Sequence, residues 1–178
     1  MALTATMRRF EVSLADSDRG VYEELDLRVA QHPSETDRYL VMRVIARCLE
    51  HAQGVELTRG LCVEDEPAIW QRDLQGTLRA WIEIGSPSVE RLHKASKTGA
   101  RVAVYGWKLM DRLAAGAADI HRADELSVFS VSHVFLDQVA ATLDRLNRWS
   151  LVVSGGSLYL SMEGRTFEAT VERLPVVG

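Results

Sequence analysis

The segment from Arg59 to Arg101 contains acidic and basic residues in an order that suits metal-dependent phosphodiester hydrolysis. An acidic cluster at 64–66 comes first, and Glu83 follows inside an otherwise apolar run. A basic helical segment that carries Lys94 comes last. Metal-dependent nucleases of one large fold class arrange their sites in this order, with an acid, an acid on a strand and then a lysine. The sequence therefore predicts phosphodiester chemistry, although it does not indicate the substrate.

The residue types point to Mg²⁺ as the metal. Mg²⁺ prefers oxygen ligands and usually takes one or two carboxylates, which Asp65 and Glu83 would supply. The carbonyl of Ile84 could add a third oxygen, and Glu35 could complete the acidic group. The metal would polarise a phosphoryl oxygen and lower the pKa of an attacking water. We expect Asp65, Glu83 and Lys94 to be catalytic, with the lysine orienting the nucleophile and offsetting charge in the transition state.

Each of these residues also has a purely structural interpretation. Glu83 could face solvent on an exposed sheet face, and Asp65 belongs to a charge run of the kind usually found in solvated turns. The sequence alone favours Glu35 as a stabilising charge at a helix N-terminus. Lys94 is placed to pair with Glu90 four residues earlier, which is ordinary on a helix surface. The sequence leaves both interpretations open.

Other chemistries lack their motifs. The five histidines show no HxxxH or HExxH spacing, so we do not expect zinc. No glycine-rich phosphate loop and no GxSxG motif is present, and Cys62 has no evident base to activate its thiol. The net charge of −4 gives no global attraction for nucleic acid, so such a partner needs a local basic patch. Arg59, Arg91 and Lys97 are the predicted nucleic-acid contacts.

Alternating and helical patterns predict the elements that position these residues. Strands are expected over 2–14, 21–29, 55–58, 68–72, 77–84, 101–107 and 126–131, with two or three more in the tail after 149. Helices are expected from Ser34 to Gly54, after Ser86 to Gly99, over 109–118 and over 134–146. We expect the first two strands to form a hairpin that extends the sheet, and 101–107 to run parallel to an earlier strand after a crossover helix.

Two details of the helices follow from the same patterns. Ser34 and Ser86 are the candidate N-caps of the first two helices. In the first helix the apolar residues recur at helical spacing, so one face must be buried, and Arg38, Arg43 and Arg47 mark the opposite face.

The 178 residues are enough for one mixed α/β domain over 1–178 with a sizeable core. No stretch of about 18 apolar residues and no signal-peptide pattern occurs, so we expect no membrane contact. Cys48 and Cys62 lie apart without CxxC spacing, and Cys48 fits a small buried apolar residue. A reduced, cytoplasmic protein is the expectation, and the sequence does not indicate an oligomeric state.

Several short motifs together resemble the YaeQ family, a small bacterial family. They are HPSET at 32–36, TRGLC at 58–62, DEP at 65–67, and WIEIGSP followed by ERLHKAS within 81–96. The resemblance implies a fold similar to the PD-(D/E)XK nucleases: a mixed β-sheet flanked by helices, with a restriction-endonuclease-like αβββαβ core and additional antiparallel strands. It also implies a Mg²⁺ site at Glu35, Asp65 and Glu83, with Lys94 as a lysine that has migrated from its usual place.

The sequence departs from the nuclease pattern at two positions. The lysine of the ExK form stands two residues after the acid, where this chain has Gly85. Glu66 and Pro67 follow Asp65, so the PD order is absent, and Asp73 is an alternative second acid. Two functions are therefore predicted: a Mg²⁺-dependent nuclease-like protein that acts on a nucleic-acid phosphodiester backbone, or a catalytically inactive nuclease-fold module that binds nucleic acid or protein.

Overall fold

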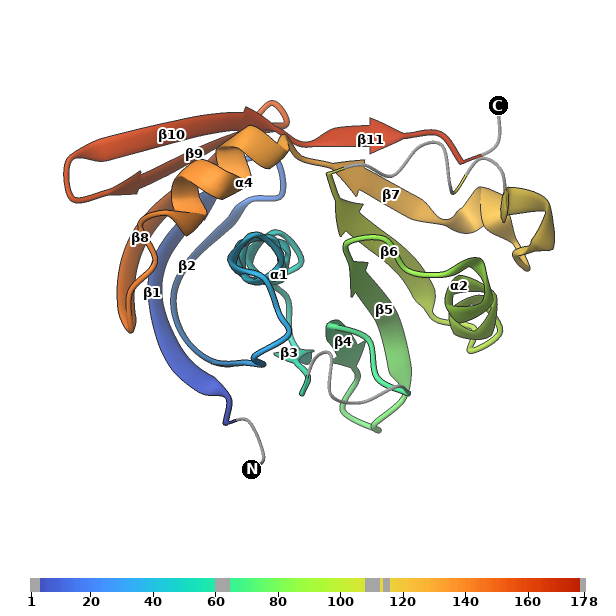
Figure 1. Ribbon diagram of the computed structural model, residues 1–178. Helices are drawn as coiled ribbons and strands as arrows, with labels where there is room; N and C mark the ends of the chain where they lie inside the picture. Colours follow the sequence, from blue (N-terminus) through green and yellow to red (C-terminus); the bar gives the residue numbers. More distant parts are fainter. Residues whose placement is uncertain (1–3, 60–64, 108–112, 114–115, 177–178) are drawn as a thin grey trace. The chain divides into compact units, whose positions relative to one another are not determined.

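The structure is a computed structural model that describes all residues except 1–3, 60–64, 108–112, 114–115 and 177–178. The chain divides into two compact units, residues 1–49 with 131–171 and residues 50–130 with 172–178. Each unit contains its own mixed β-sheet (Figure 1). The prediction of one sheet was therefore wrong, because the N-terminal hairpin pairs with tail strands of the first unit and does not extend the sheet that carries Glu83.

The first unit contains a five-stranded sheet in the order β10-β9-β8-β1-β2 and two helices. Its elements are β1 (Thr6–Asp16), β2 (Val21–Gln31), α1 (Asp37–Leu49), α4 (His133–Ala140), β8 (Leu146–Ser154), β9 (Ser157–Met162) and β10 (Arg165–Thr170). β1 and β8 run parallel, and the other pairs are antiparallel. The predicted hairpin is confirmed, as are the turns at Gly155-Gly156 and Glu163-Gly164, where all four residues have positive φ.

Alternating residues of this sheet face the core of the first unit. In β8, Asn147, Trp149, Leu151 and Val153 are buried, whereas the residues between them are exposed. The sheet curves around α1 (Figure 1), whose residues from Leu40 to Leu49 are all buried.

Arg43 and Arg47 are among the buried residues of α1, so the prediction that they mark a solvent face was wrong. Helical spacing predicts which residues share a face, but it cannot show that a helix is covered on several sides.

Two helix boundaries also differ from prediction. α1 begins at Asp37, and the side chain of Thr36, not Ser34, caps it by accepting a hydrogen bond from the Tyr39 amide at 3.2 Å. α4 ends at Ala140, six residues before the predicted end at Leu146, where β8 begins. The apolar residues between Ala140 and Leu146 fit both a helical and an alternating pattern, so the sequence predicted a helix that continues up to the start of β8.

The second unit contains a six-stranded sheet in the order β11-β7-β6-β5-β4-β3. Its elements are β3 (Val55–Leu57), β4 (Ile69–Arg72), β5 (Leu78–Ile84), α2 (Val89–Ser96), β6 (Arg101–Gly106), η2 (Ala117–Asp119), η3 (Ala123–Glu125), β7 (Ser127–Ser130) and β11 (Glu172–Leu174). β6 runs parallel to β5, which confirms the predicted crossover through α2. The helix predicted over 109–118 falls mostly outside the described residues.

α2 is anchored to this sheet by apolar packing. Leu92 and Ala95 are buried against Val102 and Val104 of β6 and the segment that leads to β7. Ser88, not the predicted Ser86, caps α2 by accepting a hydrogen bond from the Arg91 amide at 3.1 Å. This packing fixes which face of α2 is turned away from the core. No helix in the described part of the chain is long and apolar enough to cross a membrane.

Candidate active site

Glu83 lies near the carboxyl end of β5, in register with Val104 of β6. Its side chain is only 5% exposed, so it does not face solvent on an open sheet face. One carboxylate oxygen, Oε1, accepts two hydrogen bonds: from Trp81 Nε1 at 2.7 Å and from Arg91 Nε at 2.6 Å. Trp81 reaches it because residues two apart on a strand share a face.

Burial and hydrogen bonding act in opposite directions on this carboxyl group. Burial raises the pKa of Glu83, while the hydrogen bond from Trp81 and the positive charge of Arg91 favour the ionised form. A buried charge that loses its partner is strongly destabilising. Arg91 is therefore the residue that allows a carboxylate to occupy this position.

α2 also contacts the acidic loop that precedes β4. Arg91 donates a further hydrogen bond to the backbone carbonyl of Glu66. Lys94, one helical turn after Arg91, places Nζ 3.6 Å from Oδ1 of Asp65. This second pair is exposed, with Lys94 at 76% and Asp65 at 87%. One helix face thus engages both predicted acids of this unit, Glu83 through Arg91 and Asp65 through Lys94. Glu64 lies outside the described residues.

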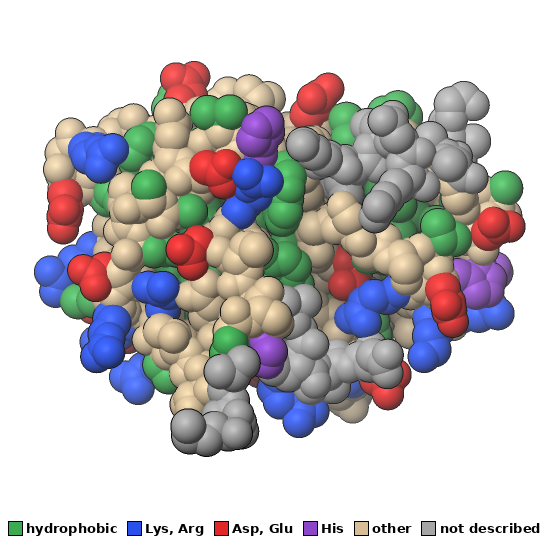
Figure 2. Space-filling model, viewed as in Figure 1, with side chains coloured by type: hydrophobic (Ala, Val, Ile, Leu, Met, Phe, Trp, Pro, Cys, Tyr) green, Lys and Arg blue, Asp and Glu red, His purple; other side chains and the backbone are tan. Residues whose placement is uncertain are grey.

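The three predicted nucleic-acid contacts differ in their surroundings. Arg59 is exposed but forms an ion pair with Glu66 at 2.8 Å. Arg91 is mostly engaged with Glu83, so its guanidinium group is not a free surface cation. Lys97 is exposed at the C-cap of α2. On the face drawn in Figure 2, described basic and acidic side chains are interspersed, so a nucleic acid would meet no large basic surface there.

The backbone conformation explains why a glycine stands where the ExK pattern has its lysine. Gly85 directly follows β5 and has a φ of +84°. Its amide donates to the Tyr105 carbonyl at 2.8 Å, which holds this conformation. Residues with a Cβ rarely adopt positive φ because of steric repulsion with the backbone. A lysine at position 85 would be strained, which agrees with the presence of the nearest lysine on α2.

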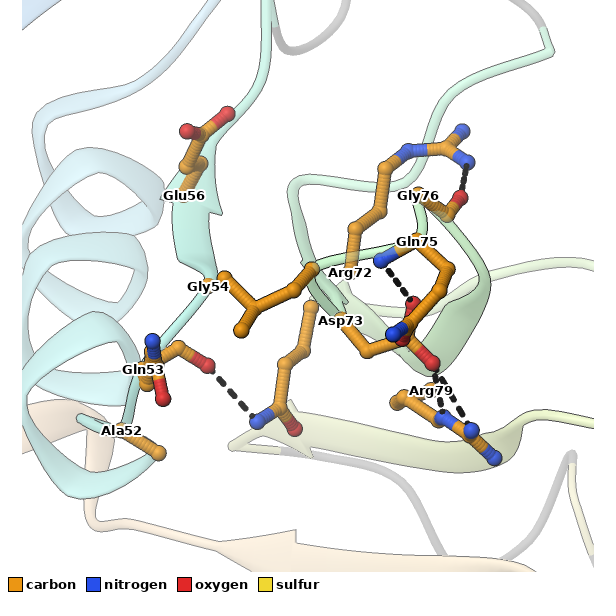
Figure 3. A pocket seen from close by; sticks show the side chains of 11 residues that line it. Ala52, Gln53, Gly54, Glu56, Arg72, Asp73, Gln75, Gly76 and Arg79 are labelled. Atoms are coloured by element: carbon orange, nitrogen blue, oxygen red, sulfur yellow. Dashed lines mark hydrogen bonds and ion pairs between the residues drawn. The ribbon is translucent and has the colours of Figure 1, made fainter.

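Asp73, the alternative second acid, stabilises the turn between β4 and β5. Figure 3 shows its carboxylate next to Gln75 and Arg79: Oδ1 accepts from the amides of Gln75 and Thr77 at 3.0 and 2.9 Å, and Oδ2 accepts from Arg79 at 2.8 Å. These bonds lower the pKa of Asp73, the Thr77 amide contributing most. Asp73 also lines a pocket of about 800 Å³ with Arg72, but both of its oxygens already serve the turn.

Glu35 belongs to the first unit and precedes α1, so it does not lie in the first turn of that helix as predicted. Its carboxylate oxygens lie 3.3 and 3.2 Å from Nη1 of Arg43, and both side chains are almost completely buried. Burial raises the pKa of Glu35, and the charge of Arg43 opposes this shift. Within its own unit, Glu35 is therefore the partner of a buried arginine.

Sequence reasoning missed the partners of Glu83. It assigned Arg91 to nucleic acid. The spacing contained one usable signal: Arg91 lies on the first turns of a helix that starts a short loop after Glu83, as does Lys94. Among the described residues, no three His, Cys, Asp or Glu side chains form a cluster that could hold a metal ion.

Comparison with known proteins gives matches over nearly the whole chain. A family model described as YaeQ protein matches residues 1–171. The chain is 31% identical to the uncharacterized protein YaeQ of Escherichia coli (strain K12), with 96% of each protein covered. It is also 31% identical to the Salmonella typhi protein of the same name, with 90% of this chain and 91% of that protein covered.

Two crystal structures have the same fold. The YaeQ protein from Xanthomonas axonopodis pv. citri superimposes with a TM-score of 0.86 at 30% identity and covers 97% of this chain and 99% of that one. The YaeQ protein from Pseudomonas syringae has a TM-score of 0.85 at 27% identity, with 96% of each chain covered.

Proposed function

This chain belongs to the YaeQ protein family, and we propose that it is a Mg²⁺-dependent nuclease-like enzyme that hydrolyses the phosphodiester backbone of a nucleic acid. The observation that carries the proposal is that two basic side chains of α2 contact two acidic side chains. Arg91 contacts Glu83 and Lys94 contacts Asp65, so one face of α2 contacts both predicted acids of the second unit.

The order of elements supports a relation to PD-(D/E)XK nucleases. α1, β3, β4, β5, α2 and β6 follow one another in the chain, which is the αβββαβ order of that superfamily. Glu83 lies on the third strand of this series, and Asp65 lies on the loop before the second. The relation in fold does not confer activity by itself, so the site residues carry the proposal.

The donor atoms fit Mg²⁺ in kind and number. Asp65 and Glu83 offer hard carboxylate oxygens, and Mg²⁺ is usually held by one or two protein carboxylates together with water and substrate phosphates. When bound, Mg²⁺ supplies polarisation of the phosphoryl oxygen and a lower pKa for the attacking water. No third carboxylate from the second unit is needed for this coordination.

The proposal gives each residue a role. Asp65 and Glu83 would hold the metal. Trp81 and Arg91 fix the position of the Glu83 carboxylate. Lys94, exposed beside Asp65, orients the nucleophile and offsets negative charge that develops on the phosphoryl group.

In this proposal, exposed basic side chains bind the substrate. Arg59 and Lys97 contact the phosphate backbone, whereas Arg91 is engaged with Glu83. Each such contact contributes to the salt dependence of binding.

The protein acts in the reducing cytoplasm, where a buried thiol such as that of Cys48 stays free.

The first test is a calorimetric titration of Mn²⁺ into the wild-type protein, Glu83→Gln, Asp65→Asn and Asp73→Asn. Glutamine keeps an oxygen that can accept the bonds from Trp81 and Arg91, so the fold should survive while metal affinity falls at least tenfold. Asp65→Asn should weaken binding similarly, and Asp73→Asn should not. The matched control is Glu90→Gln, which removes an exposed acid from the first turn of α2. Equal binding by the wild type and Glu83→Gln, or no binding by the wild type, would contradict the proposed metal site.

The second test is cleavage of single-stranded DNA, double-stranded DNA and RNA with Mg²⁺, and with EDTA as the control. Lys94→Ala should reduce the rate by about 10²-fold or more, while Lys97→Ala, three residues later on the surface, should mainly weaken substrate binding. Cleavage that survives both Glu83→Gln and Lys94→Ala would show that the active residues lie elsewhere.

One observation favours a second function, an inactive module that binds nucleic acid or protein. Oε1 of Glu83 already accepts two hydrogen bonds from protein groups, so this part of the site is stable without a metal. This alternative predicts binding that EDTA does not change and no cleavage of any of the three substrates.

A further inference from the structure

β2 forms one edge of the five-stranded sheet of the first unit. All 11 of its residues pair with β1 in one uninterrupted antiparallel register from Val21 to Gln31. In the described part of this unit, no strand lies beside its other edge. Such an edge can pair with another chain, and proteins usually protect it by a short strand, a proline, a bulge or charged side chains. β2 is long and regular and contains no proline, so its charges decide what the edge accepts.

The charged side chains beside this edge form two rows of opposite sign on the exposed face of the sheet. Arg28 lies opposite Arg9 of β1, and in the next row Asp26 lies opposite Glu11. Like charges directly opposite each other destabilise a strand pair. Arg9 is paired with Asp26 at 2.9 Å, whereas no acid in the described part of the chain lies within ion-pair distance of Arg28. The positive row therefore ends at the edge with an arginine that lacks an acidic partner among the described residues.

A second copy of β2 could pair with this edge about a two-fold axis perpendicular to the sheet. Residues opposite each other in an antiparallel ladder face the same side, so the axis must pass through a residue. An axis through Glu24, Asp26 or Arg28 would place that charged residue opposite its own copy. An axis through Leu25 would place Glu24 opposite Asp26 of the second copy. All four registers bring like charges together, and the edge charges disfavour them.

An axis through Leu27 is the one remaining register in which more than half of β2 pairs with its copy. Arg28 of each chain then lies opposite Asp26 of the other, so the positive row of one sheet continues into the negative row of the second. On the opposite face, Leu27 meets its own copy and Leu25 lies opposite Val29, which are all apolar. Charge and apolar contacts thus favour the same register.

We propose that the edge of β2 is an interface with a second copy of this chain, in which two five-stranded sheets join through antiparallel β2–β2 pairing about a two-fold axis at Leu27. Two-fold dimers are the commonest oligomers of soluble proteins. Backbone hydrogen bonds along the edge supply affinity, and the charged rows select the register. The interface uses only residues of the first unit, so it does not depend on the proposed nuclease activity.

Sedimentation velocity of the whole chain over a range of concentrations measures the association. We expect a dimer that dissociates on dilution. Asp26→Arg and Arg28→Asp should each weaken it at least about tenfold, because each places like charges opposite each other twice. Arg148→Asp is the control, since it reverses an exposed charge on β8 in the interior of the same sheet and should leave association unchanged. A monomeric wild type, or equal weakening by Arg148→Asp, would overturn the proposal.

An equimolar mixture of Asp26→Arg and Arg28→Asp tests the register and shows that both variants fold. In a mixed dimer, positions 26 and 28 are both basic in one chain and both acidic in the other, so each faces an opposite charge. The mixture should associate at least about tenfold more tightly than either variant alone. Hydrogen exchange adds a backbone measurement: amides within 23–31 that do not bond to β1 should exchange more slowly in the wild-type dimer than in the dilute monomer. No recovery in the mixture, or a dimer without this protection, would overturn the β2 interface.

Discussion

Arg91 on α2 and Glu83 on β5, eight positions apart in the chain, form an ion pair in which Nε lies 2.6 Å from Oε1. Because Arg91 also donates to the Glu66 carbonyl, this one side chain connects the strand, the helix and the acidic loop. The same helix offers Lys94 to Asp65. The candidate site is therefore assembled by positive side chains of the protein itself, and a divalent cation would have to compete with them.

The first prediction concerns the free energy of this ion pair. Glu83→Gln, Arg91→Gln and the double variant are compared by urea unfolding. Each single variant should lose about 2–3 kcal/mol, because it leaves a mostly buried partner without its counter-charge. The double variant should lose less than the sum of the two, with a coupling energy on the order of 1–3 kcal/mol.

An exposed pair of equally short length serves as the control for this cycle. Arg38 Nη2 lies 2.6 Å from Oδ2 of Asp137, with the side chains 31% and 47% exposed. Its coupling energy should stay below about 1 kcal/mol, as is usual for surface pairs. Equal coupling in the two cycles would mean that burial does not strengthen the pair of Arg91 and Glu83.

The second prediction concerns the pH dependence of stability at Glu35. Burial raises its pKa above the ordinary value of 4.5, with Arg43 opposing the shift. Between these two pKa values the folded state binds a proton that the unfolded state has lost, so stability falls as pH rises. The difference in unfolding free energy between the wild type and Glu35→Gln should be fully present below pH 4.5 and decrease as pH rises through the folded pKa. Urea unfolding from pH 4 to pH 8 measures this, and an increase with pH would show that Arg43 dominates over burial.

Local patterns were sufficient to predict most elements of the second unit. The strands β3, β4, β5, β6 and β7 lie close to their predicted ranges, and the parallel pairing of β5 with β6 follows from the crossover rule. The sequence also singled out Glu83 as a candidate site residue, since a single carboxylate inside an apolar strand is unusual. Its burial was not predictable, because that depends on α2 and on the reach of Arg91.

The division into two sheets could not be predicted from local patterns. β1 pairs in parallel with β8, so Phe10 near the N-terminus lies beside Asn147 from the last third of the chain. Alternation shows which residues share a face, but it does not identify the neighbouring strand. The same limit applies to Arg43: its helical position predicted exposure, whereas its ion pair with the buried Glu35 fits its place in the core.

The third prediction compares two glycines that have the same φ of +82°. At Gly76, beside the pocket drawn in Figure 3, an added Cβ would meet no atom within 4 Å, so Gly76→Ala should cost only the backbone strain of about 1–2 kcal/mol. At Gly54, the added Cβ would lie 1.9 Å from the Arg72 carbonyl oxygen. Gly54→Ala must therefore also displace the end of β4, which should cost about 1–3 kcal/mol more. Unfolding free energies of the two variants decide this, and equal losses would show that β3 and β4 separate easily at this point.

The fourth prediction concerns the thiol of Cys48, which is completely buried in α1. Burial raises its pKa to about 12, so at pH 8 only about one thiol in 10⁴ would be ionised, and the thiolate is the reactive form. In a Cys62→Ser variant, which leaves Cys48 as the single thiol, a disulfide reagent such as DTNB should react only as fast as the protein unfolds. The reaction rate should then rise with urea in parallel with the unfolding rate. Fast labelling in the native protein would instead show that α1 becomes exposed by local opening.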